Sequence, residues 1–440
     1  MSTSQSSRRA FVGGALTTVA AHAARPLART IGANGRIQMG VIGVGGNGTG
    51  MLRGLLARAA EKADVSVVAV SDVYTRYKER AREMAKLEAA HVYHDYRELL
   101  AKPEVDGVVI STPDHWHAQM AIDAMAAGKD VYLQKPMTLT IDEARHVAQA
   151  AGRYGRVLQV GSQHLADQRY HKAKELIEAG EIGDLLWAQG TYSRNSIDGE
   201  WNYHVDEEGT EQNIDWKRWL GSAPRRPFSA ERYFRWRKYW DYSGGIATDL
   251  FYHKLGPLLF AMGAQFPTRV TGSGGIYVQK DREVPDTYAT VIEYEKFFVN
   301  LSSSMANAAA NKHMPEVIYG QKGTIVFEPA GITVTPEPAW RDKVPQDKRA
   351  ARSIAVEKTD IGREHMADFL NCMRTRNKPV LNPQFGYQLM TAIKMGVDSY
   401  RQGKVLAFDA RTQKVVERAA ARPSYEGDGK NRPDGRRRRG

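Results

Sequence analysis

Cysteine is almost absent from this chain, which has only Cys372 among its 440 residues. No intramolecular disulfide can therefore form, and this usage suits folding in a reducing cytoplasm. Long apolar runs are also lacking beyond the N-terminal segment, so we expect no stable membrane insertion. No segment repeats at a period of about 20 to 50 residues, which excludes a repeat architecture.

Clusters of metal-binding residue types are missing as well. His115 and His117 share a face only in an extended chain, and His91 and His94 have no acidic neighbour beyond Asp95. A structural or catalytic zinc ion needs three or four such ligands held together. We therefore expect no metal.

The net charge of +12 could indicate a nucleic-acid partner, but its distribution does not. The first thirty residues hold four arginines and no acid, and residues 426–440 hold six basic and three acidic side chains. The remaining chain keeps an ordinary excess of basic residues. We expect no nucleic-acid partner, and we interpret residues 425–440 as a disordered basic tail because Gly, Asp, Arg and Pro dominate there.

A glycine cluster follows the apolar run at residues 37–42. Gly43, Gly45 and Gly48 form the pattern G-x-G-x-x-G where a first parallel strand should turn into a helix. In this pattern the first glycine allows the tight turn, the second lets the backbone approach a pyrophosphate, and the third lets the helix pack on the strand. The expected cofactor contacts here are Gly43, Gly45, Gly46, Asn47 and Gly48.

A second apolar strand, residues 65–71, ends at Asp72. A carboxylate at this place can accept hydrogen bonds from both hydroxyls of an adenosine ribose, and it would repel a 2′-phosphate. The glycine pattern and Asp72 together predict a dinucleotide site, with NAD favoured over NADP.

The N-terminus, with Arg8 and Arg9 ahead of a weakly apolar stretch, is similar to a twin-arginine export signal, and Ala21 and Ala23 offer a cleavage site. We interpret residues 1–33 as a signal peptide and expect a periplasmic or otherwise exported protein. This route carries folded proteins to a compartment where free NAD is scarce. A dinucleotide enzyme sent there should hold its cofactor tightly and regenerate it in place.

Strands alternate with helices in the first part of the chain, which predicts a doubly wound parallel sheet over residues 34–160. Its further strands are expected at 106–112, 130–134 and 157–160, and its helices at 51–60, 77–89, 117–127 and 140–154. Beyond Gly161 strands follow one another with few helices between them, at 184–192, 268–278, 287–294, 297–304, 316–319 and 324–328. This rhythm predicts an α+β domain with a large, mainly antiparallel open sheet over 161–424, closed by helices at 364–376 and 383–401. Overall, we expect an α/β fold of two domains.

This order of domains resembles the Gfo/Idh/MocA oxidoreductases, named for glucose-fructose oxidoreductase, inositol dehydrogenase and a rhizopine catabolism protein. The resemblance runs from about Arg36 to Asp409. Besides the glycine cluster, its carriers are Thr112-Pro113-Asp114 with His117, Gly128-Lys129-Asp130-Val131, Lys135-Pro136, and Gly244-Gly245-Ile246-Ala247-Thr248-Asp249 with His253. The resemblance implies further cofactor contacts at Thr112, Pro113, His117, Gln134 and Lys135. It also implies hydride transfer between NAD and a sugar hydroxyl.

Two positions depart from the family pattern. Gln134 stands where the family usually has a glutamate, and Gly256 stands where it often has an aspartate. The string from His253 to Pro257 looks instead like the histidine segment of NAD-dependent glycoside hydrolases in the same superfamily. The cofactor site is intact, but the reaction outcome stays open.

Three functions remain. The leading one is an NAD-dependent oxidoreductase acting on a sugar or sugar derivative, and its rival is a redox-neutral glycoside hydrolase. The third is a non-catalytic carbohydrate-binding module, against which the intact Gly43, Asp72, Lys135 and His253 argue.

The expected catalytic residues are Lys135, His253 and Asp249. Lys135 lies just past the carboxyl end of a strand, where open parallel sheets bind ligands. His253 is the preferred base, and Asp249, one helical turn earlier, would fix the tautomer of its imidazole. Because Gln134 is neutral, we expect Lys135 to have no neighbouring anion.

Polar and aromatic residues beyond the domain junction indicate a carbohydrate-sized cleft, because sugars stack on aromatic rings and hydrogen-bond to Arg and Asn. The predicted substrate contacts are Gln163, Arg169, Tyr170, Arg194, Asn195, Trp236 and Arg237, with Arg194 and Arg237 ranked first. The open face of the second sheet needs covering, so we also expect a homodimer or homotetramer.

Overall fold

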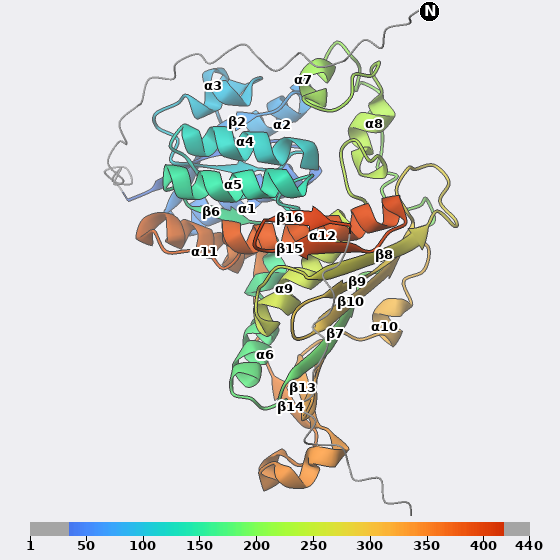
Figure 1. The fold of residues 1–440 in the computed structure, drawn as a ribbon. Helices are drawn as coiled ribbons and strands as arrows, with labels where there is room; N and C mark the ends of the chain where they lie inside the picture. Colours follow the sequence, from blue (N-terminus) through green and yellow to red (C-terminus); the bar gives the residue numbers. More distant parts are fainter. Residues whose placement is uncertain (1–34, 418–440) are drawn as a thin grey trace, which may run out of the picture.

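The computed structural model describes residues 35–417. The predicted signal peptide and the predicted basic tail lie outside these residues. Two sheets organise the described chain, and helices pack against both of them (Figure 1). The predicted fold class is confirmed. Within residues 35–417, no helix combines the length and the apolar character that a bilayer span needs.

The N-terminal region contains a six-stranded parallel sheet in the order β3-β2-β1-β4-β5-β6. Its strands are β1 (Ile37–Ile42), β2 (Val65–Ser71), β3 (Val92–Tyr93), β4 (Gly107–Ile110), β5 (Asp130–Leu133) and β6 (Leu158–Val160). The strand order reverses between β1 and β4. In sheets of this kind ligands bind outside the carboxyl ends of the strands at that reversal, which here lies at the Gly43 turn.

Helices cover both faces of this sheet. They are α1 (Gly46–Lys62), α2 (Thr75–Ala85), α3 (Tyr96–Leu100), α4 (Asp114–Ala126) and α5 (Ile141–Tyr154), with α11 (Ile361–Thr375) added from the end of the chain. Leu52 and Leu55 of α1 share one apolar cluster with Phe369 and Leu370 of α11, whereas α4 and α5 pack into another. The start of α5 follows from its sequence, because Thr140 and Glu143 form a capping box.

The second region contains a ten-stranded sheet in the order β14-β13-β12-β11-β7-β10-β9-β8-β15-β16. Its strands are β7 (Leu185–Thr191), β8 (Arg269–Gly275), β9 (Thr287–Glu293), β10 (Phe298–Ser304), β11 (Val317–Gly320), β12 (Gly323–Glu328), β13 (Gly331–Pro336), β14 (Arg352–Ala355), β15 (Leu406–Asp409) and β16 (Lys414–Val416). All neighbours are antiparallel except β7 and β10. The sequence did not predict the last four strands.

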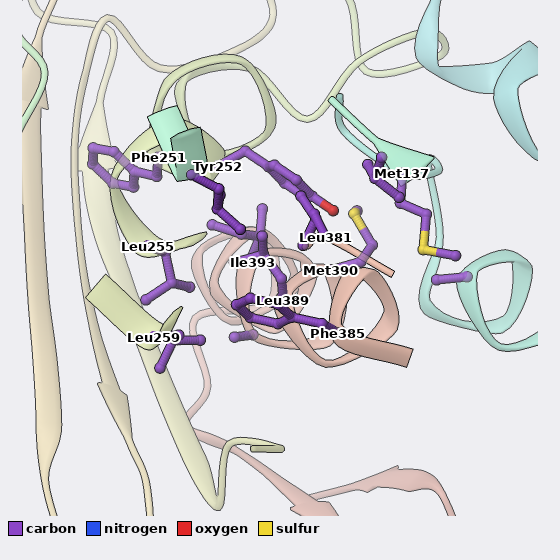
Figure 2. Close-up of a cluster of buried hydrophobic side chains, with 14 of the residues drawn as sticks. Met137, Phe251, Tyr252, Leu255, Leu259, Leu381, Phe385, Leu389, Met390 and Ile393 are labelled. Atoms are coloured by element: carbon purple, nitrogen blue, oxygen red, sulfur yellow. The ribbon is translucent and has the colours of Figure 1, made fainter. Parts of the chain in front are cut away.

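Three helices, α6 (Gln168–Glu178), α9 (Tyr252–Met262) and α12 (Pro383–Gln402), pack on one face of the large sheet (Figure 1). Figure 2 shows how α12 joins the two regions. Its Leu389 and Ile393 lie against Leu255 of α9, and its Phe385 and Met390 face Met137, which follows the Lys135-Pro136 pair. This buried cluster holds the start of α9 in a constant position relative to the Lys135 turn.

Between β7 and α9 the chain leaves the sheet and returns to the first region. We call residues 203–242 the cover segment. It contains the short helices α7 (Trp216–Leu220) and α8 (Ala230–Phe234), and α7 lies beside the edge of the first region near α2 (Figure 1). The cover segment therefore lies across the carboxyl end of the parallel sheet.

Candidate functional site

The glycine turn has the geometry that its sequence predicts. Gly43 follows β1 with φ at +80°, and a Cβ added there would lie 2.6 Å from the carbonyl oxygen of Ser111. A Cβ on Gly48 would lie 1.8 Å from the carbonyl oxygen of Gly43. Gly43 thus makes the tight turn, and Gly48 lets α1 pack directly on it.

The first turn of α1 is suited to a diphosphate. Its N-cap residue, Gly45, offers no side-chain cap, and the first turn carries no acidic residue. The first N–H groups of any helix lack intrahelical acceptors. Gly45, Gly46 and Asn47 line a cleft, and a Cβ on Gly46 would meet nothing within 4 Å. The turn therefore offers unpaired N–H donors and open space, which is what a dinucleotide requires.

Asp72 lines the same cleft and also braces the glycine turn. One carboxylate oxygen accepts from the backbone N–H of Val44 at 2.8 Å, and the other accepts from that of Tyr74 at 2.9 Å. Burial raises the pKa of Asp72. Each oxygen keeps lone-pair capacity for a further donor such as a ribose hydroxyl.

The cleft has a volume of 720 Å³ and is lined by both regions. The predicted site residues that line it are Gly43, Gly45, Gly46, Asn47, Asp72, Thr112, Pro113, Gln134, Lys135, Arg194, Trp236, Arg237, Asp249 and His253. Gly48 does not line the cleft, because it packs against the carbonyl of Gly43. The five others lie elsewhere: His117, Gln163, Arg169, Tyr170 and Asn195.

His117 supports the cleft wall and does not line the cleft. It is buried in the first turn of α4, with Nδ1 2.7 Å from the carbonyl oxygen of Pro136 and Nε2 2.9 Å from that of Thr112. Burial lowers the pKa of His117 to about 4. Because α4 already begins at Asp114, His117 faces inward and ties two loops of the cleft wall together.

Four predicted substrate contacts lie outside this cleft. Arg169 pairs with the Asp167 carboxylate, and Tyr170 donates from its hydroxyl to Glu316 at 2.5 Å. Gln163 donates to the hydroxyl of Tyr132, and Asn195 pairs with Ala306 beside a separate cavity. The first three residues were predicted because they follow the domain junction in the sequence. In the structure, this part of the chain packs against the large sheet instead of lining the cleft.

Lys135 does have an anionic neighbour, contrary to the prediction. Its Nζ lies 2.7 Å from Oδ1 of Asp249 and 2.8 Å from the Asp249 backbone carbonyl. The same carboxylate accepts from Arg237 Nε at 3.1 Å and from Trp201 Nε1 at 3.1 Å. The anion beside Lys135 thus comes from a segment 114 residues further along the chain.

Within residues 35–417 no hydrogen bond joins Asp249 to His253, contrary to the prediction. Residues Ala247–Phe251 form a π-helical turn ahead of α9, and its wider i→i+5 spacing breaks the one-turn relation on which that prediction depended. Nδ1 of His253 instead lies 3.2 Å from Nδ1 of His164 and 3.3 Å from the Ser162 hydroxyl. Burial, Lys135 and His164 together hold the pKa of His253 well below its usual range.

Sequence reasoning also missed Asp114, which lies behind this cluster. Its carboxylate is 2% exposed, and its Oδ2 has no hydrogen-bond partner among the described residues. Burial raises the pKa of Asp114 to about 7, although Arg237 and Lys135 oppose that shift. In the sequence, the position of Asp114 directly after Pro113 could have marked it as a site residue.

The end of the cleft next to Asp72 was missed almost entirely. Residues of the β3–α3 turn, of α3 and of α4 line it from one side, and residues of the cover segment line it from the other. The first group is His94, Asp95, Tyr96, Arg97 and Trp116, and the second is Arg218, Trp219, Tyr233 and Phe234. No short motif marks them because the two groups lie more than a hundred positions apart. Within residues 35–417, no group of three or more His, Cys, Asp or Glu residues is arranged to hold a metal ion.

Together, the fold and the cleft define a two-domain dinucleotide-binding protein in which the second domain supplies charged groups to the cofactor cleft. Residues 37–162 match the family model described as "Oxidoreductase family, NAD-binding Rossmann fold". Residues 174–408 match the model described as "Oxidoreductase family, C-terminal alpha/beta domain". The chain belongs to the Gfo/Idh/MocA oxidoreductase family, and its N-terminal domain is an NAD-binding Rossmann domain.

Relatives of known name share parts of this arrangement. The chain is 33% identical over 190 residues to inositol 2-dehydrogenase of Pseudomonas fluorescens strain SBW25, an alignment covering 42% of this chain and 54% of that protein. The chain thus spans about half the length of the curated relatives it matches. Two solved structures have the same fold. Levoglucosan dehydrogenase in complex with NADH and L-sorbose gives a TM-score of 0.66 at 19% identity, covering 84% of this chain and 98% of that one. Aldose-aldose oxidoreductase from Caulobacter crescentus, complexed with glycerol, gives 0.63 at 18% identity, covering 85% and 100%.

Proposed function

We propose that this protein is an NAD-dependent oxidoreductase that transfers a hydride between a hydroxyl of a sugar or sugar derivative and tightly bound NAD. The observation that carries the proposal is the meeting of Lys135 and His253, from different domains, in the cleft that begins at the Gly43 turn. The named relatives, which include an inositol dehydrogenase and a levoglucosan dehydrogenase, support a polyhydroxylated substrate.

The cofactor would lie against the first turn of α1, with Asp72 at its ribose and with Thr112, Pro113, Gln134 and Lys135 toward the second domain. When bound, NAD supplies the hydride acceptor for alcohol oxidation. The buried amide of Gln134 has an Nε2 donor without a partner among the described residues, as expected of a group that faces a ligand.

His253 is the base in this proposal. Its Nδ1 faces His164, so a proton on Nδ1 that is donated to His164 leaves Nε2 as the acceptor for the substrate hydroxyl proton. His164 thereby takes the tautomer-setting part that the sequence suggested for Asp249. The lowered pKa of His253 keeps its imidazole neutral, which is the form that a general base requires.

Lys135 is the second catalytic group, and its ammonium would stabilise negative charge developing on the substrate oxygen. Asp249 holds this ammonium at 2.7 Å and so fixes where the positive charge lies. Arg194, Trp236 and Arg237 line the rest of the cleft, and the Arg237 guanidinium lies 4.2 Å from the centre of the Trp236 ring. We propose these three as the sugar contacts.

A redox-neutral glycoside hydrolase is the second candidate. It is favoured by the string from His253 to Pro257 and by the packing of Gly256, where a Cβ would lie 3.2 Å from both Leu165 and Leu389. An aspartate side chain would therefore have to displace these two leucines at the position where the family often carries one. A binding module without catalysis would not need Lys135 and His253 in one cleft.

Two assays on the purified full-length protein separate these candidates. Mass spectrometry after denaturation should release NAD. Incubation with sugars and polyols should then change the nicotinamide absorbance. The change should either grow in proportion to the product or appear transiently while the cofactor is reduced. Release of the aglycone from aryl glycosides without any change in that absorbance would favour the hydrolase, whereas carbohydrate binding without bound NAD or turnover would favour the module.

We also propose that two or four copies associate through the face of the large sheet opposite α6, α9 and α12. On this face the Trp187 ring stacks on Tyr319 at 4.1 Å and on Phe298 at 5.7 Å between ring centres. Val291 and Phe298 are each 38% exposed there. Such an aromatic row on an exposed part of a sheet face is typical of a surface that a second copy buries.

Export by the twin-arginine pathway remains a proposal, supported by Arg8 and Arg9 ahead of a weakly apolar stretch. These residues lie outside those that the structure describes. Fusion of residues 1–33 to a reporter that must fold in the cytoplasm tests it, and replacement of both arginines by lysine should abolish its export.

A further inference from the structure

The cover segment is joined to the cofactor domain immediately after Asp72. The backbone N–H of Asp215 donates to the carbonyl oxygen of Val73 at 3.0 Å, and the N–H of Thr75 donates to that of Asn213 at 3.0 Å. These two bonds form an antiparallel bridge between Tyr74 and Ile214. A segment that belongs to the second domain by sequence thus extends the carboxyl end of β2.

Side chains reinforce the bridge along its length. The Tyr74 hydroxyl donates to Asp206 at 2.8 Å, and the Asp215 carboxylate lies 3.1 Å from Nε2 of His94. Further along, the carbonyl oxygen of Trp219 accepts from Trp116 Nε1 at 2.7 Å, with Nε2 of His115 at 2.9 Å. The cover segment is therefore attached to β2, to the β3–α3 turn and to α4.

Packing at these attachments is tight. Tyr74 and Tyr242 are fully buried, and Trp219 is 4% exposed in the same cluster of aromatic side chains. A Cβ on Gly221 would lie 2.5 Å from the Trp116 ring, so the segment lies directly against α4. Burial of this much aromatic surface makes the cover segment costly to detach.

The same segment lines the part of the cleft next to Asp72. Arg218, Trp219, Tyr233 and Phe234 lie on its inner side, across the cleft from Asp72, Tyr77, Asp95, Arg97 and Trp116. A nucleotide in contact with Asp72 would thus have the Rossmann domain on one side and the cover segment on the other.

We infer that the cover segment, residues 203–242, is a second nucleotide-binding element that retains the adenosine half of the cofactor through successive turnovers. This inference rests on the proposed function. A dinucleotide cannot leave sideways past Trp219 and Phe234 unless the Tyr74–Ile214 bridge and its side-chain contacts open first. The protein is then loaded once and does not exchange cofactor with a free pool during catalysis.

Retention restricts the overall reaction. A hydride removed from a substrate C–H bond leaves two electrons on the retained cofactor, and the hydroxyl proton goes to His253. Both must be returned in the same cleft before the next cycle. One candidate hydride acceptor is the carbonyl of a second sugar-like substrate, which becomes a hydroxyl. The other is the first substrate itself, after a chemical change that leaves it able to take the hydride back.

Exchange of bound cofactor tests the inference without reference to activity. The full-length protein is loaded with NAD, dialysed, mixed with isotopically labelled NAD, and sampled by mass spectrometry after denaturation. We expect close to one equivalent to survive dialysis and to exchange slowly. Tyr74→Phe removes only the hydroxyl that binds Asp206 and should speed exchange about three- to tenfold, as the loss of one hydrogen bond implies. The combined Tyr74→Phe and Asp206→Ala variant should exchange faster still.

Asp64→Ala is the matched control. It breaks an ion pair with Arg58 of 2.6 Å next to the opposite end of β2, away from the cleft, and should leave exchange unchanged. Cofactor that exchanges within seconds in the parent protein, or at the parental rate in folded Tyr74→Phe, overturns the inference while leaving the proposed function intact. A parent protein that releases no NAD on denaturation, and that binds none after co-refolding with NAD, overturns the proposed function itself.

Discussion

At the scale of single residues, one carboxylate organises the charges in the cleft. Asp249 binds both Lys135 and Arg237 through Oδ1. Burial alone would raise the pKa of Asp249, but these two cations outweigh it and hold that pKa well below its usual range. Asp249 is therefore a permanent anion, and Lys135 keeps its position through every step of a reaction cycle.

Removal of either catalytic group should lower turnover with the cofactor still bound. We expect Lys135→Ala and His253→Ala each to reduce kcat by about a hundredfold or more, since a positioned acid or base contributes about 10² to 10⁴. Steady-state kinetics and the amount of NAD released on denaturation check both parts. Lys172→Ala and His146→Ala change a partly exposed and an exposed residue outside the cleft and serve as controls. Near-normal turnover in a cleft variant would remove that residue from the mechanism.

Asp114 makes folding stability depend on pH. Its pKa is raised from 3.8 to about 7, so the folded protein holds the proton more tightly than the unfolded chain. The free energy of unfolding therefore falls as the pH rises from 4 to 7, and this loss is complete above that range. Asp114→Asn should be stabilising at pH 8, with an effect that shrinks toward pH 4. Urea unfolding at several pH values measures this difference, and a difference independent of pH would contradict it.

At the scale of elements, the turn from β1 into α1 depends on the absence of a side chain at one position. Gly48→Ala would place a methyl group 1.8 Å from the carbonyl oxygen of Gly43, so the turn must open. We expect a lower melting temperature and NAD binding weakened at least tenfold, both measurable on the purified variant by calorimetry.

Gly50→Ala is the matched control for this prediction, because it changes an exposed position of the same helix with nothing within 4 Å of the added Cβ. It should bind NAD normally and gain up to about 1 kcal/mol of stability from the higher helix propensity of alanine. Equal behaviour of the two variants would show that the close approach of Gly48 to Gly43 is unimportant.

Elements with a strong local pattern could be predicted from the sequence. The parallel strands are short apolar runs bounded by turns, and α5 begins at its capping box. The strands β14 and β16 could not be predicted because they are short edge strands of mixed composition, held by pairing with their neighbours. The π-helical turn at Ala247–Phe251 likewise leaves no signature in the spacing of apolar residues.

The same distinction applies to the site. The glycine turn, Lys135 and His253 lie in local motifs, and the structure brings them to one cleft. The contacts of His253 with His164 and of Lys135 with Asp249 join segments about a hundred residues apart. Only tertiary packing creates them, so no local pattern could reveal them.

At the scale of the whole molecule, the exposed aromatic row of the large sheet should determine the assembly. Light scattering coupled to gel filtration should give the mass of two or four chains. Phe298→Glu with Val291→Glu places charge in the centre of the aromatic row and should yield monomers. Val415→Glu alters an equally exposed valine on β16, paired with the inward-facing Phe408, and should leave the assembly unchanged. A monomeric parent protein would refute this interface.

The cover segment also sets an order of events during synthesis. Residues 35–160 leave the ribosome before residues 203–242, and during that interval the Gly43 turn faces the surrounding solution without its second wall. We expect loading with nucleotide to be most efficient in this window, while the chain is still being made. A purified chain from which NAD has been removed should then rebind NAD only as fast as the cover segment detaches. Co-refolding with NAD should restore full occupancy, whereas mixing the folded chain with NAD should not.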